Sequence, residues 1–264
     1  MRRAVDVARG PEAATPRTLP VEPAGPTTPE LPPLANGALG FVERLGEDVD
    51  AALQHDPAAR SRLEVALLYP GVHAIWMHRF AHALWTHGRP LVARVVSQVN
   101  RFVTGIEIHP GARIGRRVFM DHGMGIVIGE TAAVGDGCLL YKGVVLGGVS
   151  LERKIRHPQL GRNVVVGSNA CVLGAIEIGE GARIGSGSVV IKAVPPGATV
   201  VGIPGRVVTP DASRAHLEAT LDHGDLPDPV ADMIRGLAER NDELEQRIQK
   251  LEGAVKRGMG EDVE

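Results

Sequence analysis

The sequence predicts a mixed fold: an N-terminal α-helical domain, then a parallel β-helix of six-residue repeats, then a C-terminal helix. The first observation behind this prediction is a change of hydrophobic period, from three and four residues before about residue 105 to six residues after it. The second is composition. Only 3% of residues are aromatic while 33 are glycine, which suits a core of small aliphatic side chains stacked in tight turns.

Changes of pattern divide the 264 residues into four segments. Residues 1–36 carry eight prolines and too little apolar surface to offset the entropy of ordering, so we expect a disordered tail. Residues 37–105 should form the helical domain, and residues 106–208 the β-helix. Residues 209–264 form a C-terminal extension with a coiled coil predicted over 228–252.

The helical domain is indicated by apolar residues that recur at three- and four-residue spacing and so share one helix face. They are Leu39, Val42, Leu45, Val49 and Leu53. Gly71–Trp85 and Leu91–Val103 continue the pattern. Pro57 and Pro90 interrupt it, because the residue before a proline resists helical geometry.

The β-helix is indicated by aliphatic anchors at a spacing of six, eight of which are followed directly by glycine. The anchors are Ile108, Ile114, Met120, Ile126, Ile128, Val134, Leu140, Leu146, Leu160, Val166, Val172, Ile178, Ile184 and Val190. A triangular coil explains this period: each side is a short strand with its anchor inward, and glycine eases the corner. The gap of fourteen residues between Leu146 and Leu160, where two repeats would take twelve, predicts a charged binding loop over 149–159.

The C-terminal extension carries a heptad seam. Ile234, Asn241 and Ile248 take position a, and Leu237, Leu244 and Leu251 take position d. In a parallel pair, Arg240 would meet Glu245 of the partner helix, and Arg247 would meet Glu252. The alternative is a lone amphipathic helix lying on its own domain.

Composition excludes several classes of partner. The formal net charge is −2, which gives no basic surface for nucleic acid or an anionic membrane. No apolar run has the length of a membrane span, and the basic start Met1–Arg3 is followed by no signal-peptide core. Cys138 and Cys171 are too few for a disulfide framework, so we expect a reduced, cytoplasmic protein.

One family resemblance is specific. The run GIEIHPGARIGRRVFMDHGMGIVIGET (Gly105–Thr131), the pair Arg156-His157 and the segment GIPGRVV (Gly202–Val208) resemble the serine acetyltransferases, which are hexapeptide-repeat acyltransferases. The resemblance implies a left-handed β-helix, acetyl-CoA as co-substrate with no tightly bound cofactor, and L-serine as acceptor. It also implies a homo-oligomer, either a trimer or a dimer of trimers, with active sites between neighbours.

The catalytic base that the resemblance implies is His122. A serine hydroxyl is a weak nucleophile, and an imidazole, with an ordinary pKa of about 6.5, can take its proton at neutral pH. A carboxylate must hold the imidazole in the right tautomer. By resemblance that residue is Glu107, where many family members have aspartate; an exposed charge on the coil is the alternative.

The acceptor offers an ammonium and a carboxylate, so its pocket needs both signs of charge. By resemblance Asp56 and Asp121 match the acidic contacts, and Arg156 and His157 match the basic ones. Arginine suits a carboxylate because its planar fork bonds both oxygens. Asp56 has a second interpretation, as a helix cap beside Pro57.

Gly148, Ser168 and Ser186 match the family's acetyl-CoA contacts. We expect no metal site. His78 and His82 stand four apart on a helix but have no evident third ligand, so we interpret them as packing residues. Cys138 has the same interpretation.

Other functions stay open on the same fold. They are acyl transfer to another amino alcohol such as homoserine, a metal-dependent hydratase, and a non-catalytic assembly scaffold. The family is also known for a cysteine synthase complex that needs an apolar C-terminal residue. This chain ends in Glu264, whose carboxylate would be costly to bury, so we expect no tight complex.

Overall fold

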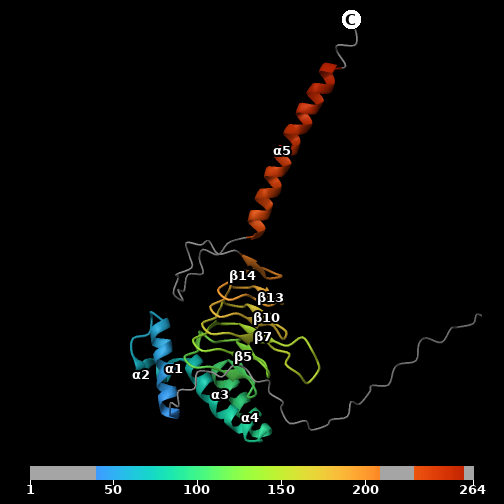
Figure 1. The fold of residues 1–264 in the computed structure, drawn as a ribbon. Coiled ribbons are helices and arrows are strands. Elements are labelled where there is room, and N and C mark those ends of the chain that lie inside the picture. Colours follow the sequence, from blue (N-terminus) through green and yellow to red (C-terminus); the bar gives the residue numbers. More distant parts are fainter. Residues whose placement is uncertain (1–39, 209–228, 259–264) are drawn as a thin grey trace, which may run out of the picture.

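The computed structural model describes residues 40–208 and 229–258, and the interpretations of the N-terminal tail and of Glu264 lie outside these residues. Four helices come first, then a three-sided parallel β-helix, then one long helix (Figure 1). The predicted fold class is confirmed. Among the described residues, no helix combines the length and the apolar character that a membrane span requires.

The helical region contains α1 (Phe41–His55), α2 (Arg62–Leu68), α3 (Pro70–Thr86) and α4 (Pro90–Thr104). The three predicted helical segments correspond to α1, α3 and α4. Helices α3 and α4 each begin at a proline, whose missing N–H has no partner to lose in the first turn of a helix. The short α2 was not predicted. Ser61 caps it by accepting the N–H of Glu64 at 3.2 Å.

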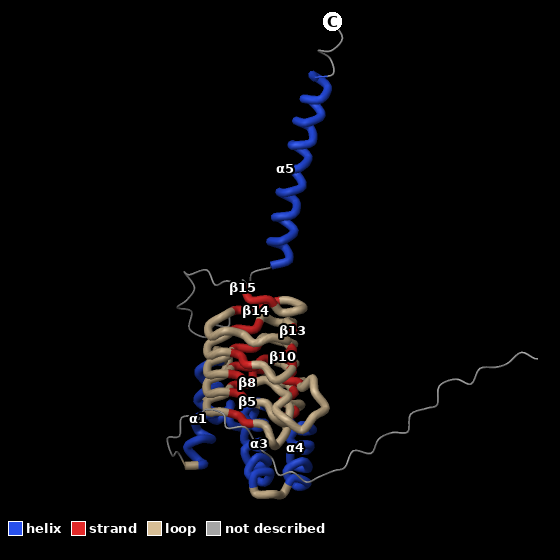
Figure 2. The backbone as a smooth tube through the Cα atoms, turned by 45° about the vertical axis from the view of Figure 1, so that its right-hand side comes forward, coloured by secondary structure: helices blue, strands red, loops and turns tan. Residues whose placement is uncertain are grey.

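Three parallel sheets form the sides of the prism (Figure 2). Side 1 contains β1 (Glu107–Ile108), β4 (Val127–Ile128), β7 (Val145–Gly147), β10 (Cys171–Leu173) and β13 (Val189–Val190). Side 2 contains β2 (Arg113–Ile114), β5 (Ala133–Val134), β8 (Gln159–Leu160) and β11 (Glu177–Ile178). Side 3 contains β3 (Phe119–Asp121), β6 (Leu139–Tyr141), β9 (Val165–Val166), β12 (Arg183–Ile184) and β14 (Thr199–Val201), and it ends with the antiparallel β15 (Arg206–Val208).

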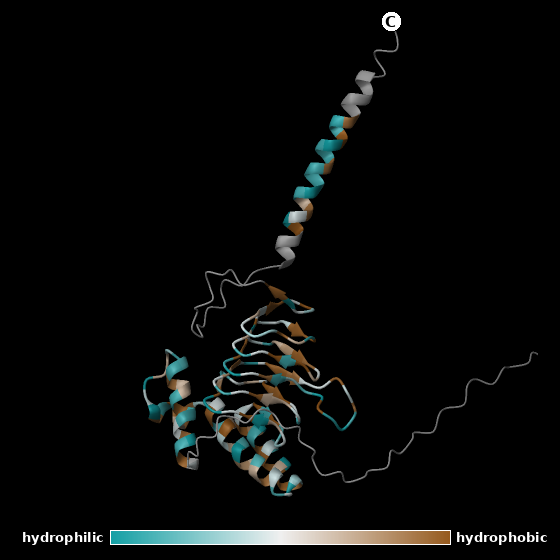
Figure 3. Cartoon of the chain, viewed as in Figure 1, coloured by the Kyte–Doolittle hydropathy of each residue, from teal (hydrophilic) through white to brown (hydrophobic). Residues whose placement is uncertain are grey.

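The anchors stack in register inside the prism, as predicted. Ile108, Ile128, Leu146, Val172 and Val190 form one such column along side 1. All five are at most 2% exposed. Figure 3 shows the apolar strands running up the prism.

Two details of the repeat differ from the prediction. Ile126 is not a strand anchor; it is buried in the corner before β4, because the turn at His122 makes the first coil two residues longer than the regular eighteen. The interval from Leu146 to Leu160 replaces a six-residue step between sides 1 and 2, not a twelve-residue one. Eight additional residues therefore form the loop that projects from the prism (Figures 1 and 2).

Helix α3 closes the base of the prism. Ile75 and Ala74 belong to the same buried cluster as the anchors of the first coil. Gly71 makes this approach possible, because a Cβ there would lie 2.2 Å from the carbonyl oxygen of Met120. The first coil is thereby fixed to a helix on one side and to the next coil on the other.

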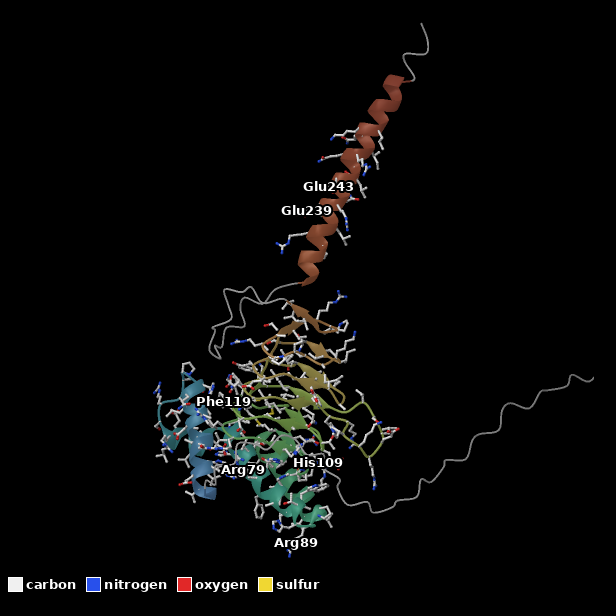
Figure 4. The ribbon with its side chains drawn as sticks, in the orientation of Figure 1. Arg79, Arg89, His109, Phe119, Glu239 and Glu243 are labelled. Carbon is white, nitrogen blue, oxygen red and sulfur yellow. The ribbon has the colours of Figure 1, made fainter. Side chains whose placement is uncertain are left out.

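Helix α1 packs against the outer face of side 3. Val49 and Ala52 share a second buried cluster with Phe119, and His55 stacks on that ring with centroids 6.0 Å apart. Phe119 is labelled in Figure 4, beside α1. This packing brings the C-terminal end of α1 to the strand that ends at Asp121.

Helix α5 (Pro229–Gly258) spans the predicted coiled coil and extends six residues beyond it. Every residue from Ile234 to Leu251 is exposed in the single chain. The helix therefore does not lie on its own domain along this stretch.

Candidate functional site

His122 lies in the turn between β3 and β4, at the corner where side 3 meets side 1 (the 3–1 corner). Its backbone is in the left-handed region with a φ of 57°, and its side chain is 77% exposed. Gly125 follows with a φ of 79° and donates its N–H to the carbonyl of Gly105 at 2.9 Å. The two extra residues of this coil thus form a fixed turn that holds an imidazole outside the prism.

Two carboxylates lie beside this turn. Asp121 ends β3, and its Oδ2 is 3.8 Å from Nε2 of His122. Asp56 follows α1, where its Oδ2 accepts the hydroxyl of Tyr69 at 2.5 Å. Burial raises the pKa of Asp121; His122 lowers it and the charge of Asp56 raises it. Two acids that repel each other in a partly buried place favour the arrival of a cation.

Asp56 does not cap the start of a helix. Its residue is the C-cap of α1, and its Oδ1 accepts the N–H of Ala58 at 2.8 Å, as in an Asx-turn. Its other oxygen, Oδ2, is the one that accepts the hydroxyl of Tyr69. The local role and the binding role are therefore compatible in one side chain.

Arg156 and His157 lie where the projecting loop returns to the prism, at the corner between sides 1 and 2 (the 1–2 corner). Arg156 donates from Nη2 to Oε2 of Glu130 at 2.8 Å. Its backbone N–H donates to Oγ1 of Thr131 at 3.0 Å. Glu130 thus holds the guanidinium at the corner that carries His157.

His157 is fixed in one tautomer. Its Nδ1 accepts the backbone N–H of Thr131 at 3.2 Å, so Nε2 carries the hydrogen in the neutral ring. Burial lowers the pKa of His157, and the charge of Arg156 lowers it further. The ring packs against Gly129, where a Cβ would lie 2.0 Å from it. A neutral Nε2–H donor therefore lies beside Gly148 and the guanidinium.

Glu107 begins β1 and lies near the 3–1 corner, two residues after the glycine that holds the His122 turn. Its Oε2 is 3.3 Å from Nε of Arg101, on the last turn of α4. The carboxylate adjacent to the imidazole of His122 is that of Asp121. The structure thus brings Glu107 to the right corner but pairs its side chain with an arginine.

The three residues matched to acetyl-CoA fall on two corners. Ser168 and Ser186 occupy the 3–1 corner on successive coils, and the N–H of Gly187 donates to the carbonyl of Ser168 at 2.8 Å. Between them and His122, the intervening coil places the exposed Lys142 at the same corner. Gly148 lies at the 1–2 corner, exposed, against Arg156 and His157.

The candidate residues therefore form two groups in one chain. The acidic group and His122 lie at the 3–1 corner, and the basic group lies at the 1–2 corner. Side 1 separates them, and within the described part of the chain no hydrogen bond or ion pair joins the two groups. A ligand with an ammonium and a carboxylate could meet both groups if the 3–1 corner of one copy faced the 1–2 corner of another.

Three supporting residues were not identified from the sequence. Tyr69 holds Asp56, while Glu130 and Thr131 hold the basic pair. Glu130 and Thr131 are the last two residues of the motif Gly105–Thr131, so their place in that motif marked them as candidates. Tyr69 carried no such signal, because it is the single residue between α2 and α3 and no repeat distinguishes it.

Comparison with known proteins identifies relatives of this chain. A family model described as bacterial transferase hexapeptide (six repeats) matches residues 157–192. A serine acetyltransferase of Bacillus licheniformis is 51% identical over 222 residues, which cover 84% of this chain and 99% of that protein. One from Bacillus subtilis is 51% identical over 209 residues, 79% of this chain and 95% of its own.

Solved structures give the same family. Soybean serine acetyltransferase complexed with serine is 42% identical with a TM-score of 0.61, over 63% of this chain and 68% of that one. The enzyme of Brucella abortus in complex with coenzyme A is 38% identical with a TM-score of 0.62, over 64% of this chain and 67% of that one.

Proposed function

The chain belongs to the serine acetyltransferase family, and we propose that it works through a site shared between two copies of the prism. Its reaction is the transfer of an acetyl group from acetyl-CoA to the hydroxyl of L-serine. The product, O-acetylserine, carries an acetate leaving group that a sulfur nucleophile can displace. We therefore assign the reaction to cysteine biosynthesis.

The acceptor is recognised by its two charges. The ammonium of serine binds between Asp56 and Asp121, whose mutual repulsion it relieves. The carboxylate binds the guanidinium of Arg156 and the Nε2–H of His157 on the facing copy. The serine complex of the soybean relative supports this class of ligand.

His122 acts as the general base. Its exposed ring can reach a hydroxyl bound outside the prism, and it takes the serine proton as the oxygen attacks the acetyl carbonyl. When the tetrahedral intermediate collapses, the imidazolium returns the proton to the coenzyme A thiolate. Asp121 and Glu107 supply negative charge at this corner to stabilise the imidazolium.

Acetyl-CoA binds along the edge that rises from His122. Ser168 and Ser186 present small side chains along that edge, and Gly148 of the facing copy, which lies against Arg156 and His157, carries no side chain. The coenzyme A complex of the Brucella relative supports this class of co-substrate. The co-substrate is consumed and released, so no resident cofactor is required.

The observation that carries the shared site is the separation of the two charged groups by side 1. A three-fold ring brings the 3–1 corner of each copy against the 1–2 corner of the next, which completes three identical sites. We therefore propose a trimer as the smallest active particle.

The activity is tested by following thiol release from acetyl-CoA with L-serine and, separately, with L-homoserine. We expect release that depends on serine, with kcat/KM higher for serine than for homoserine. A higher value for homoserine would assign another acceptor. No release with either amino acid would favour an assembly scaffold.

A further inference from the structure

The C-terminal helix carries an apolar seam that acetyl transfer does not use. Ile234, Leu237, Leu244, Ile248 and Leu251 are 53–61% exposed in the single chain. They occupy a and d positions over three successive heptads. Figure 3 shows most of the other residues of this stretch as hydrophilic. An exposed apolar stripe of this kind is stable in water when another helix covers it.

The charges beside the seam select the covering helix. Arg240 and Arg247 take position g, while Glu245 and Glu252 take position e of the following heptads. Residues g and e of successive heptads face each other in a parallel coiled coil. Two copies of this helix in parallel would therefore form Arg–Glu pairs on both flanks of the seam, so the charge pattern is complementary to itself.

The same charges disfavour the antiparallel arrangement. There position g faces g and position e faces e, which would set arginine against arginine and glutamate against glutamate. Two trimers that met end to end through these helices would cross them in this antiparallel way. The helices that pair should therefore start from the same end of their prisms.

Asn241 adds a constraint on register. It interrupts the apolar seam at an a position, and in the single chain its Nδ2 donates to Oε1 of Glu245 at 3.2 Å. A buried amide at position a is tolerated when it meets the same residue of a partner, which fixes the alignment. A helix of another sequence would leave this amide against an apolar side chain.

We propose that α5 is a parallel, homotypic coiled coil whose other strands are the α5 helices of further copies of this chain in the same particle. The partner is thus a second copy, held in register at Asn241. The coiled coil links the chains through residues that lie outside the acetyl-transfer site.

Disulfide trapping in the full-length protein tests the orientation. Leu237→Cys places a thiol near one end of the seam, at a d position. In a parallel coil it meets itself, and in an antiparallel coil it would face the region of Ile248. Glu239→Cys, at the outward f position and labelled in Figure 4, is the matched control. The parent chain, with Cys138 and Cys171, gives the background.

After mild oxidation, we expect Leu237→Cys to shift to the mass of two linked chains on a non-reducing denaturing gel. Glu239→Cys should stay at the mass of one chain. Equal linking at both positions, or at neither, would overturn the proposal.

Charge reversal tests whether the charged residues beside the seam select the partner helix. Arg240→Glu with Arg247→Glu should abolish the linking of Leu237→Cys, and adding Glu245→Arg with Glu252→Arg should restore it. Linking that survives the reversal would overturn the role of these pairs. Thiol release from acetyl-CoA should be unchanged in every variant, which shows that the prism is folded and separates this test from that of the catalytic proposal.

Discussion

The side chains assigned to chemistry occupy corners of the prism, where the backbone leaves strand geometry. The motif residues were assigned through the resemblance of the quoted runs to the serine acetyltransferases, and His122 follows directly on the last strand of the first coil. Their neighbours were harder to find. The pairing of Glu107 with Arg101 depends on where α4 ends relative to the first strand, which no local pattern reports.

His122→Ala should lower kcat by about 10²–10⁴, because it removes the general base while the binding residues stay in place. Steady-state kinetics of thiol release gives this value, and the KM for acetyl-CoA should change little. Glu107→Gln should cost less, since it keeps the base and alters only the charge near it. A kcat close to that of the parent in His122→Ala would remove this residue from the mechanism.

Arg156→Ala should raise the KM for serine far more than the KM for acetyl-CoA, because the substrate carboxylate loses a charge-assisted partner. Arg156→Lys is the matched control. Its KM for serine should fall between those of the parent and of Arg156→Ala, since lysine keeps the charge but loses the planar fork. Both constants come from initial rates with one substrate varied at a time. Equal changes in the two KM values would place the amino-acid pocket elsewhere.

At the scale of elements, the six-residue period was sufficient to predict the prism, because only inward anchors recur in that way. The period could not give the length of individual turns. Because the turn at His122 has two extra residues, counting in sixes predicted a strand anchor at Ile126. Ile126 instead fills the buried corner before β4. Helix α2 was missed because its seven residues are too few for a helical period to emerge.

The packing of α3 on the prism makes stability depend on pH. Burial, together with the charge of His82, lowers the pKa of His78 to about 3. The unfolded chain binds this proton with a pKa of about 6.5. Below that pH the unfolded state therefore holds a proton that the folded state rejects, so stability is full above about 6.5 and falls as pH decreases toward 3.

Replacing this histidine should flatten the dependence. At pH 5 the parent should have lost about 2 kcal/mol of stability through His78 relative to pH 7.5, and His78→Leu should not show this loss. Urea unfolding midpoints at both pH values and one protein concentration measure the difference. His109, whose pKa burial lowers to about 4, remains in both proteins and cancels. Parallel pH profiles for the two proteins would contradict the assignment.

At the scale of the whole molecule, one chain carries the acidic group with His122 at the 3–1 corner, the basic group at the 1–2 corner, and the exposed helix α5. The sequence motifs name the members of both groups but not the corner that each occupies. The corner depends on which side of the prism each strand belongs to: residues 121–122 lie at the end of a side 3 strand, whereas residues 156–157 precede a side 2 strand. Under the shared-site proposal, function arises on assembly, when the corners of neighbouring copies complete the site and α5 links the chains.

Subunit complementation tests the shared site most directly. His122→Ala and Arg156→Ala are co-expressed, and thiol release is measured at a serine concentration below KM, where each variant alone is nearly inactive. If each site takes His122 from one copy and Arg156 from its neighbour, about a third of the sites in mixed three-fold rings carry both residues, which is about a quarter of all sites in a random one-to-one mixture, and activity should rise to about a quarter of the parent value. If both residues came from the same chain, the mixture would show only the average of the two inactive variants, and that result would contradict the account.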